Sequence, residues 1–235
     1  VRPGIYHVTF TCVRRLYLLW PGKRLNKVIR YLAALTSERY GVLIHDLTAM
    51  SNHVHLKVGD QYGNHPEAFA FFESMLARQV NALLGETGAV FEPYEVVELL
   101  DDDAILDTAG YVLANPVHDH LVEKAAQWPG VTTCSMKYGE RGVIKRPAVG
   151  LWADLKDKER RLVKKRKPDS TGRMKYRGTP SELPDEVVLE LVRPPVLPGR
   201  SDEEVRAEVL ARVAKAEDAA RAERKVTGRK VGNVK

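Results

Sequence analysis

Residues 42–58 have the sequence VLIHDLTAMSNHVHLKV, and this stretch decides the fold. Its two halves, 42–50 and 53–58, are short runs rich in β-branched and apolar residues, which predicts two strands. The turn residues Ser51-Asn52 lie between them and favour a hairpin, so the strands should pair antiparallel. Apolar and polar residues alternate in the second run, and three of them should fill the core: Val54, Leu56 and Val58.

The segments on either side of this hairpin extend the pattern. Residues 6–13 (YHVTFTCV) alternate as a half-buried strand, and apolar residues then recur at helical spacing over 25–41, where a glycine supplies a stop. A second amphipathic helix is expected over 69–85 and a fourth strand within 91–100. This order predicts an α+β, ferredoxin-like βαββαβ fold, in which an antiparallel sheet carries two helices on one face and leaves the other available for a site.

One further helix is expected outside this unit. Asp101 to Asp103 can cap its start and complement its dipole. The helix should pass through Ile105 and Tyr111 and end near Asn115, because Pro116 follows and proline breaks helices.

The length of 235 residues fits one catalytic domain at 1–150 followed by a basic, Pro-rich C-terminal extension at 151–235. The extension begins with a Lys- and Arg-rich segment at 156–177 that has too few apolar residues to form a core alone. Prolines between 180 and 198 indicate an extended linker, and a capping box at Ser201 and Glu204 starts a charged helix. The helix has a narrow apolar stripe and therefore needs a partner: Val205, Val209 and Val213. Residues 224–235 should be disordered and basic.

The composition limits the class of protein. A net charge of +6 and a pI near 9.2 favour a polyanionic partner, with nucleic acid as the first choice. No apolar run approaches the roughly 20 residues of a membrane span, and no secretion signal opens the chain, so we expect a cytoplasmic protein without membrane contact. Cys12 and Cys134 stand in no CxxC pair and are expected to be packing residues.

Two pairs of residues carry the candidate chemistry. His53 and His55 are two apart on a strand, so their imidazoles share one face at a Cα separation of about 6.6–7 Å and can converge on one divalent ion. The alternative is a pair of surface or hydrogen-bonded histidines. Tyr111 and Asn115 are four apart on a helix and also share a face, which places a phenol beside an amide. The alternative here is a core tyrosine and a helix C-cap.

These two blocks, MSNHVHLKV and YVLANPVHDHLV, resemble in order and spacing the signature pair of single-tyrosine HUH transposases, and most closely the REP-associated tyrosine transposases. The resemblance covers about residues 5–128 and implies the HUH endonuclease fold. It assigns His53 and His55 as metal ligands, Asn115 as a third, weaker ligand and Tyr111 as the catalytic nucleophile. It also implies cleavage and rejoining of DNA through a 5′-phosphotyrosine.

The sequence departs from the family at His118-Asp119-His120, where an arginine and small residues are usual. This departure could alter DNA contacts at the helix exit. We expect these three residues to be loop positions with their polar side chains in water rather than a second metal site.

A nitrogen and oxygen ligand set without cysteine favours Mg²⁺ or Mn²⁺ as the cofactor. The expected substrate is single-stranded or hairpin DNA, with palindromic repeat elements implied by the family. Candidate phosphate contacts are basic side chains from two parts of the chain: Arg14, Arg15, Lys57, Lys164, Lys165, Arg166 and Lys167.

Two other functions compete with this hypothesis. One is a domesticated protein that binds hairpin DNA without cutting it, against which the intact set of four site residues argues. The other is a replication initiator or relaxase, which usually carries a larger domain than this length allows. The sequence leaves open whether the active unit is a monomer or a homodimer.

Overall fold

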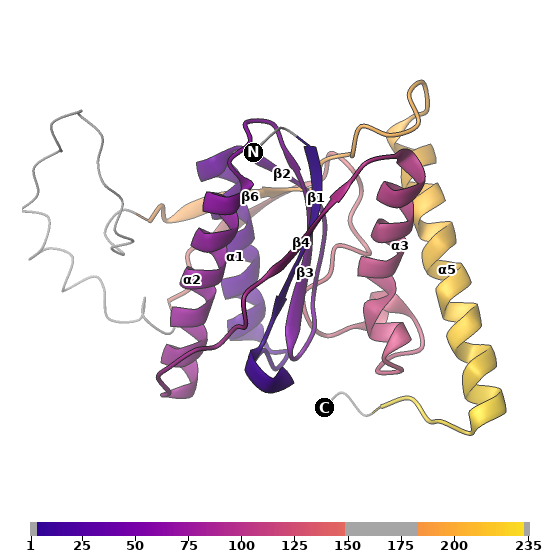
Figure 1. Ribbon diagram of the computed structural model, residues 1–235, viewed down its shortest axis with the longest axis horizontal. Coiled ribbons are helices and arrows are strands. Elements are labelled where there is room, and N and C mark those ends of the chain that lie inside the picture. The colour runs from indigo at the N-terminus through magenta and orange to yellow at the C-terminus, as the bar shows by residue number, and fades with distance from the viewer. Residues whose placement is uncertain (1–3, 149–182, 233–235) are drawn as a thin grey trace, which may run out of the picture.

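The computed structural model describes residues 4–148 and 183–232. At its centre is a four-stranded antiparallel sheet (Figure 1) whose strands are β1 (Gly4–Thr11), β2 (Val42–Ala49), β3 (His53–Asp60) and β4 (Glu95–Leu99), in the order β2-β3-β1-β4. With α1 (Lys23–Tyr40) and α2 (His65–Leu84) between them, the element order is βαββαβ. The α+β, ferredoxin-like fold predicted from the sequence is therefore confirmed.

Helices α1 and α2 cover one face of the sheet (Figure 1). Both helices end at the glycines that the sequence predicted as stops. Gly41 and Gly85 have φ of 67° and 70°, in the left-handed region that favours glycine. The alternating residues of β3 fill the core beneath these helices, as expected: Val54, Leu56 and Val58.

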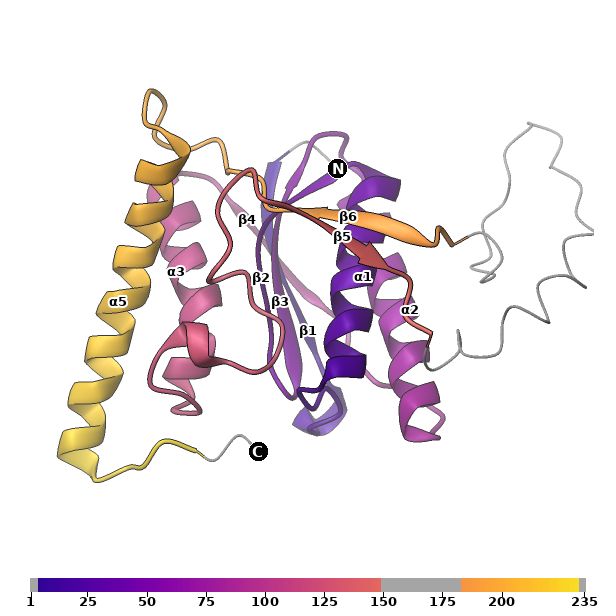
Figure 2. The same ribbon diagram turned by 180° about the vertical axis from the view of Figure 1, so that it is seen from behind.

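The opposite face of the sheet is not left free. Helix α3 (Asp102–His118) lies on it, and α5 (Asp202–Thr227) lies along the outer side of α3 (Figures 1 and 2). Helix α3 contacts mainly β2 and β3, and the part of this face on β1 and β4 stays open, as at Val97 with 56% exposure. A site on this face can therefore lie at the border between α3 and the open strands.

Helix α3 is longer than the sequence predicted. It was expected to end near Asn115, but it continues through Pro116 to His118, so that prediction is wrong. A proline this close to the end of a helix removes one hydrogen bond, the one that Val112 would accept. Burial of the last turn stabilises the helix against this loss, and the backbone N–H of Asp119 donates to the carbonyl of Asn115 at 3.1 Å.

A second, two-stranded sheet joins the predicted catalytic domain to its extension: β5 (Arg141–Lys145), from the former, pairs with β6 (Glu186–Glu190), from the latter, beside α1 (Figure 2). The predicted extended linker is therefore wrong at residues 186–190. Two short 3₁₀ turns, η1 (Val13–Arg15) and η2 (Ala125–Gln127), complete the described elements. The basic segment 156–177 and the expected boundary at 150 lie outside the described residues.

Helix α5 begins with the predicted capping box at Ser201 and Glu204. Its valine stripe packs in one apolar cluster with α3, which is the partner that the helix needed: Val205, Val209 and Val213. Residues 224–227 are helical, contrary to the expected disorder, because the helix continues to a glycine cap at Gly228.

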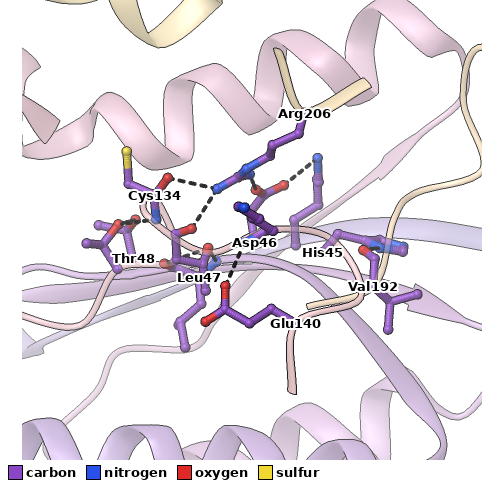
Figure 3. A network of polar contacts seen from close by, with 12 residues as sticks. His45, Asp46, Leu47, Thr48, Cys134, Glu140, Val192 and Arg206 are labelled. Carbon is purple, nitrogen blue, oxygen red and sulfur yellow. Dashed lines mark hydrogen bonds and ion pairs between the residues drawn. The ribbon is translucent and has the colours of Figure 1, made fainter. Parts of the chain in front are cut away.

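A buried arginine joins α5 to the rest of the molecule. Arg206 is 5% exposed, and its guanidinium donates to the carbonyls of Thr133 and Cys134 at 2.6 and 3.0 Å. It also lies 3.4 Å from a carboxylate oxygen of Asp46 on β2 (Figure 3). The C-terminal helix is thereby fixed to the central sheet by charge as well as by apolar packing.

Two smaller expectations concern the cysteines and the membrane. Cys12 and Cys134 are both buried free thiols, as predicted for packing residues. Among the residues that the structure describes, no helix has the length and apolar character needed to cross a lipid bilayer.

Candidate active site

The candidate site lies between β3 and α3. His53, His55 and Lys57 follow one another on the side of β3 that faces α3, because alternate residues of a strand share a face. At one end Asn115 contacts the two histidines, and at the other the Lys57 ammonium donates to the carbonyl of Ile105 at 3.0 Å. Four residues of strand span about 13 Å and ten residues of helix about 15 Å, so α3 runs antiparallel to β3 and matches it in length.

Three of the side chains predicted for the site meet at the end of α3 nearest the hairpin. The Asn115 Oδ1 atom lies 3.2 Å from His53 Nε2, and the Asn115 Nδ2 atom lies 3.1 Å from His55 Nε2. The carboxamide thus touches the Nε2 atoms of both imidazoles. Asn115 lies within α3 and the C-cap is Asp119, so the alternative that Asn115 caps the helix is wrong.

The outer ring nitrogens of both histidines have partners of their own. His53 Nδ1 donates to Asn52 Oδ1 at 2.7 Å, and His55 Nδ1 lies 3.1 Å from both Thr9 Oγ1 and His7 Nε2. Such contacts fix the orientation of each ring and turn the Nε2 atoms inward.

The sequence prediction did not include Asn52, Thr9 or His7 in the site. A signal for two of them was present, because His7 and Thr9 lie on the polar face of the first strand. Only the antiparallel register, which sets Thr9 opposite His55, brings that face to the histidines.

Burial keeps the imidazoles neutral. It lowers the pKa of His55 to about 2, helped by the nearby His53 and His7, and lowers that of His7 to about 4. The pKa of His53 is also lowered by burial, although the hydrogen bond to Asn115 opposes this. Neutral imidazole is the form that binds a metal ion, so at neutral pH all three rings are in the form that can act as a ligand.

The geometry of the three side chains fits a divalent cation. Two ligands at right angles on an ion with bonds of about 2.1 Å lie about 3.0 Å apart, close to the 3.2 Å between His53 Nε2 and Asn115 Oδ1. With the His53 Nδ1 proton directed to Asn52, the Nε2 lone pair faces the Asn115 Oδ1 oxygen, an arrangement that a cation would stabilise. Among residues 4–148 and 183–232, no group of three His, Cys, Asp or Glu side chains gathers at a possible metal site, so an ion here needs Asn115.

Tyr111 lies one helical turn before Asn115 and faces the same space. Its ring centroid is 5.4 Å from that of His55, and its side chain is 47% exposed, so the alternative of a core tyrosine is wrong. A cavity of about 650 Å³, called here the site cavity, is lined by the four predicted residues together: His53, His55, Tyr111 and Asn115. The phenol therefore borders the same open space as the three inward-facing side chains.

Comparisons with known proteins give structural likenesses only. No protein-family model matches the sequence, and no curated protein matches it. A REP-associated tyrosine transposase bound to a REP hairpin matches with a TM-score of 0.48 and 15% identity, over 57% of this chain and 78% of that one. A putative transposase from Deinococcus radiodurans matches with a TM-score of 0.36 and 17% identity, over 48% of this chain and 90% of that one.

The first of these structures is a REP-associated tyrosine transposase, and the likeness to it is one of fold over part of the chain. This is the family that the two sequence blocks resemble. Both TM-scores are below 0.5, so these likenesses concern the fold alone.

The segment that departs from the family matches the expectation in part, since His118 and Asp119 are exposed. His118 belongs to α3, and its ring lies 5.8 Å from that of Tyr111, while Asp119 lines the site cavity. His120 is only 3% exposed, with its Nε2 atom 3.4 Å from a Glu223 carboxylate oxygen, so the expectation that it lies in water is wrong. Packing of the C-terminal helix and the residues after it over this turn causes the burial.

The predicted phosphate contacts divide into three groups. Arg14 and Arg15 are exposed and line the site cavity. Lys57 is 0% exposed, and its ammonium lies 2.7 Å from an Asp46 carboxylate oxygen, so its prediction as a DNA contact is wrong. Lys57 shares a face of β3 with the two histidines, but α3 closes over this end of the strand and keeps the ammonium away from DNA. The remaining four residues, 164–167, lie outside the described residues.

Proposed function

We propose that this chain is a metal-dependent nuclease and transposase that cleaves and rejoins single-stranded DNA through a 5′-phosphotyrosine at Tyr111. The observation that carries the proposal is the position of Asn115. Its carboxamide contacts the Nε2 atoms of His53 and His55, and the phenol one turn earlier on the same helix borders the same cavity. A half-exposed phenol beside three uncharged ligand groups fits covalent attack on a phosphodiester.

A phosphodiester resists attack because its negative charge repels nucleophiles. Mg²⁺ or Mn²⁺, when bound by His53, His55 and Asn115, would neutralise that charge and polarise the phosphate as a Lewis acid. The protein holds these ligands ready before substrate binds. Asn52 and Thr9 orient the two rings, and burial keeps the imidazoles neutral.

Tyr111 supplies the attacking oxygen. As its Oη forms a bond to phosphorus, the bond from phosphorus to the 3′ oxygen breaks, the phenol proton passes to solvent and the leaving oxygen takes up a proton. The product is a 5′-phosphotyrosine with a free 3′-hydroxyl. One phosphodiester is exchanged for another of similar energy, so a second 3′-hydroxyl can reverse the step and join strands without an external energy source.

An unpaired strand is the substrate that suits this site. The phenol and the two arginines of the cavity reach a backbone only where it is accessible. The net charge of +6 favours a polyanion, and Arg14 and Arg15 can contact its phosphates. By resemblance to its family, the protein would act on hairpins of palindromic repeat elements, and it would do so as a soluble cytoplasmic enzyme.

The test is formation of a covalent adduct. The full chain is incubated with Mn²⁺ and an end-labelled DNA hairpin that has single-stranded flanks, and adducts are resolved on a denaturing gel. Tyr111→Phe should lower the rate of adduct formation by on the order of 10⁴-fold or more, because the nucleophile is lost. The matched control is Tyr62→Phe, since Tyr62 is a 71% exposed tyrosine beyond the opposite end of β3.

Removal of divalent ions with EDTA should also abolish the adduct. If the parent protein binds the hairpin but forms no adduct with any divalent ion, the proposal fails and the non-cleaving hairpin-binding protein takes its place. An adduct of equal yield in Tyr111→Phe would show that another residue is the nucleophile.

A further inference from the structure

Next to the site cavity lies a loop with two exposed aromatic side chains. Tyr17 is 68% exposed and Trp20 is 54% exposed. Together they line a second hollow of about 430 Å³, called here the aromatic pocket, whose wall also includes Trp128 and Arg229. Large aromatic side chains left in solvent on a folded protein usually indicate a binding surface.

We propose that Tyr17 and Trp20 form a stacking subsite for the unpaired bases next to the phosphate that is cleaved. The position of that phosphate rests on the proposed function. Stacking on aromatic rings is the common way in which proteins hold single-stranded nucleic acid, because every base has a π-face whatever its identity.

The aromatic pocket is continuous with the site cavity. Asn52 and Asp119 line both hollows. Asn52 is also the residue whose side chain accepts the hydrogen bond from His53. A strand whose phosphate lies at the histidines would therefore pass over Asn52 and reach the aromatic pocket that Tyr17 and Trp20 line.

The aromatic loop is anchored to the turn that carries the first histidine. The backbone N–H of Cys12 donates to the carbonyl of Asn52, and that of Leu19 donates to the carbonyl of Ser51, both at 2.8 Å. Leu19 is 2% exposed and holds the loop to the core. The rings thus have a fixed relation to the site, which lowers the entropic cost of binding a flexible strand.

The backbone of the loop supports a binding role. Arg14 and Arg15 have φ of 52° and 53°, in the left-handed region that residues other than glycine rarely adopt. Strain of this kind clusters at functional sites. It places both arginines on the wall of the site cavity, directly before the segment that carries Tyr17.

Charge around the two hollows favours a nucleic acid as the occupant. Arg14 and Arg15 border the site cavity, and Arg229 borders the aromatic pocket. Three carboxylates also lie on these walls: Glu92, Glu95 and Asp119. Of these, Glu92 accepts a hydrogen bond from the backbone N–H of Arg14. Cations beside an aromatic surface can pair with phosphates of a strand whose bases stack on the rings.

Binding experiments can separate stacking from phosphate contact. Fluorescence anisotropy on the full chain in EDTA, where no cleavage occurs, would use three labelled probes: a hairpin with an unpaired flank, the same hairpin with an abasic flank, and a blunt hairpin. The double variant Tyr17→Ser/Trp20→Ser should bind the flanked hairpin about tenfold or more weakly. Its affinity for the abasic and blunt probes should change less than about twofold, because those probes lack bases to stack.

Two further variants test whether weaker binding by the double serine variant comes from a folding defect. Tyr17→Phe/Trp20→Phe retains the rings and should bind the flanked hairpin as the parent does. Tyr62→Ser removes a tyrosine of similar exposure outside both hollows and should also leave binding unchanged.

Equal binding of the flanked hairpin by the parent and the double serine variant would overturn the proposal. So would a double variant that keeps its DNA affinity but has a lower mass in solution, since the rings would then join two copies of the chain. The proposed function has its own readout in the Tyr111 adduct. Flank-dependent binding without any covalent adduct would contradict the proposed function but support the stacking subsite. A covalent adduct without flank-dependent binding would support the proposed function but contradict the stacking subsite.

Discussion

Two polar clusters lie on the same face of β3 under the same helix, and they differ in what surrounds them. At one end, His53 and His55 meet Asn115 beside an open cavity. At the other end, Lys57 pairs with Asp46, and both side chains are 0% exposed. Residues two apart on one strand thus have opposite environments, one open to a substrate and one sealed.

The comparison shows that access, more than polarity, separates a site from a structural cluster. In the sealed cluster every charge has an opposite charge nearby, because Asp46 lies between Lys57 and Arg206. Burial lowers the pKa of Lys57, and the attraction of Asp46 opposes that shift. In the open cluster the two imidazoles and the Asn115 carboxamide are uncharged and meet beside a cavity, an arrangement that suits the proposed cation and phosphate.

The largest effect on stability is expected from Lys57→Met. This change leaves Asp46 buried with only the more distant Arg206, at 3.4 Å, and should lower the free energy of unfolding by about 3–5 kcal/mol. Urea unfolding of both proteins measures the difference. Lys27→Met, at an exposed lysine on α1, is the control and should change stability by less than about 0.5 kcal/mol. A loss below about 1 kcal/mol for Lys57→Met would show that the sealed cluster is not stabilised by this pairing.

The next largest effect is expected in the open cluster, on the binding of a metal ion. Asn52→Ala removes the acceptor that orients His53, at 2.7 Å from its Nδ1 atom, and should weaken Mn²⁺ binding by about 10- to 100-fold. The thermal midpoint should change little, because Asn52 lies at the edge of the cavity. Isothermal titration of Mn²⁺ into the variant and the parent tests this. Equal affinities would mean that the ring is held by other contacts.

A pH effect is expected at His45, which lies next to Asp46 in the sequence but outside both clusters. Its Nδ1 donates to the carbonyl of Val192 at 2.7 Å (Figure 3), and burial lowers its pKa to about 4 from 6.5. Between these values the unfolded chain binds a proton that the folded chain does not. The stability from neutral His45 is therefore present above pH 6.5 and is lost as the pH falls towards 4.

The variant His45→Asn keeps a donor near the position of Nδ1 and removes this titration. The slope of the unfolding free energy against pH between 4 and 6.5 should decrease by up to about 1.4 kcal/mol per pH unit, the contribution of one proton. Urea unfolding at a series of pH values gives both slopes. An unchanged slope would assign the proton uptake to other groups.

The smallest effect is expected at the outer surface between α3 and α5. Arg212 pairs with Asp107 across the two helices at 2.7 Å, but the carboxylate is 72% exposed and screened by water. Asp107→Asn should therefore lower the free energy of unfolding by less than about 1 kcal/mol. Arg206, earlier on α5, is the buried counterpart, and Arg206→Met should lower the free energy of unfolding several times more. Equal losses of unfolding free energy in the two variants would show that burial does not determine how much an ion pair stabilises this protein.

Much of this protein follows from local sequence patterns. The alternation in 53–58 and the glycine stops at 41 and 85 predicted the strands and helices of the sheet unit, and the order of elements predicted the fold. Spacing also predicted which side chains share a face, so His53 with His55 and Tyr111 with Asn115 could be paired in advance. These properties depend on backbone periodicity, which neighbouring residues set.

Only the tertiary structure decided which of these faces meet and which remain open. The sequence pattern places Lys57 beside the two histidines, but α3 and Arg206 seal it from solvent. Likewise, Thr9 and His7 support His55 only through the register of β1 on β3, and α3 extends past Pro116 because its last turn is buried. Burial and contact depend on residues far apart in the chain, so they arise from packing and not from the local pattern that determines each element.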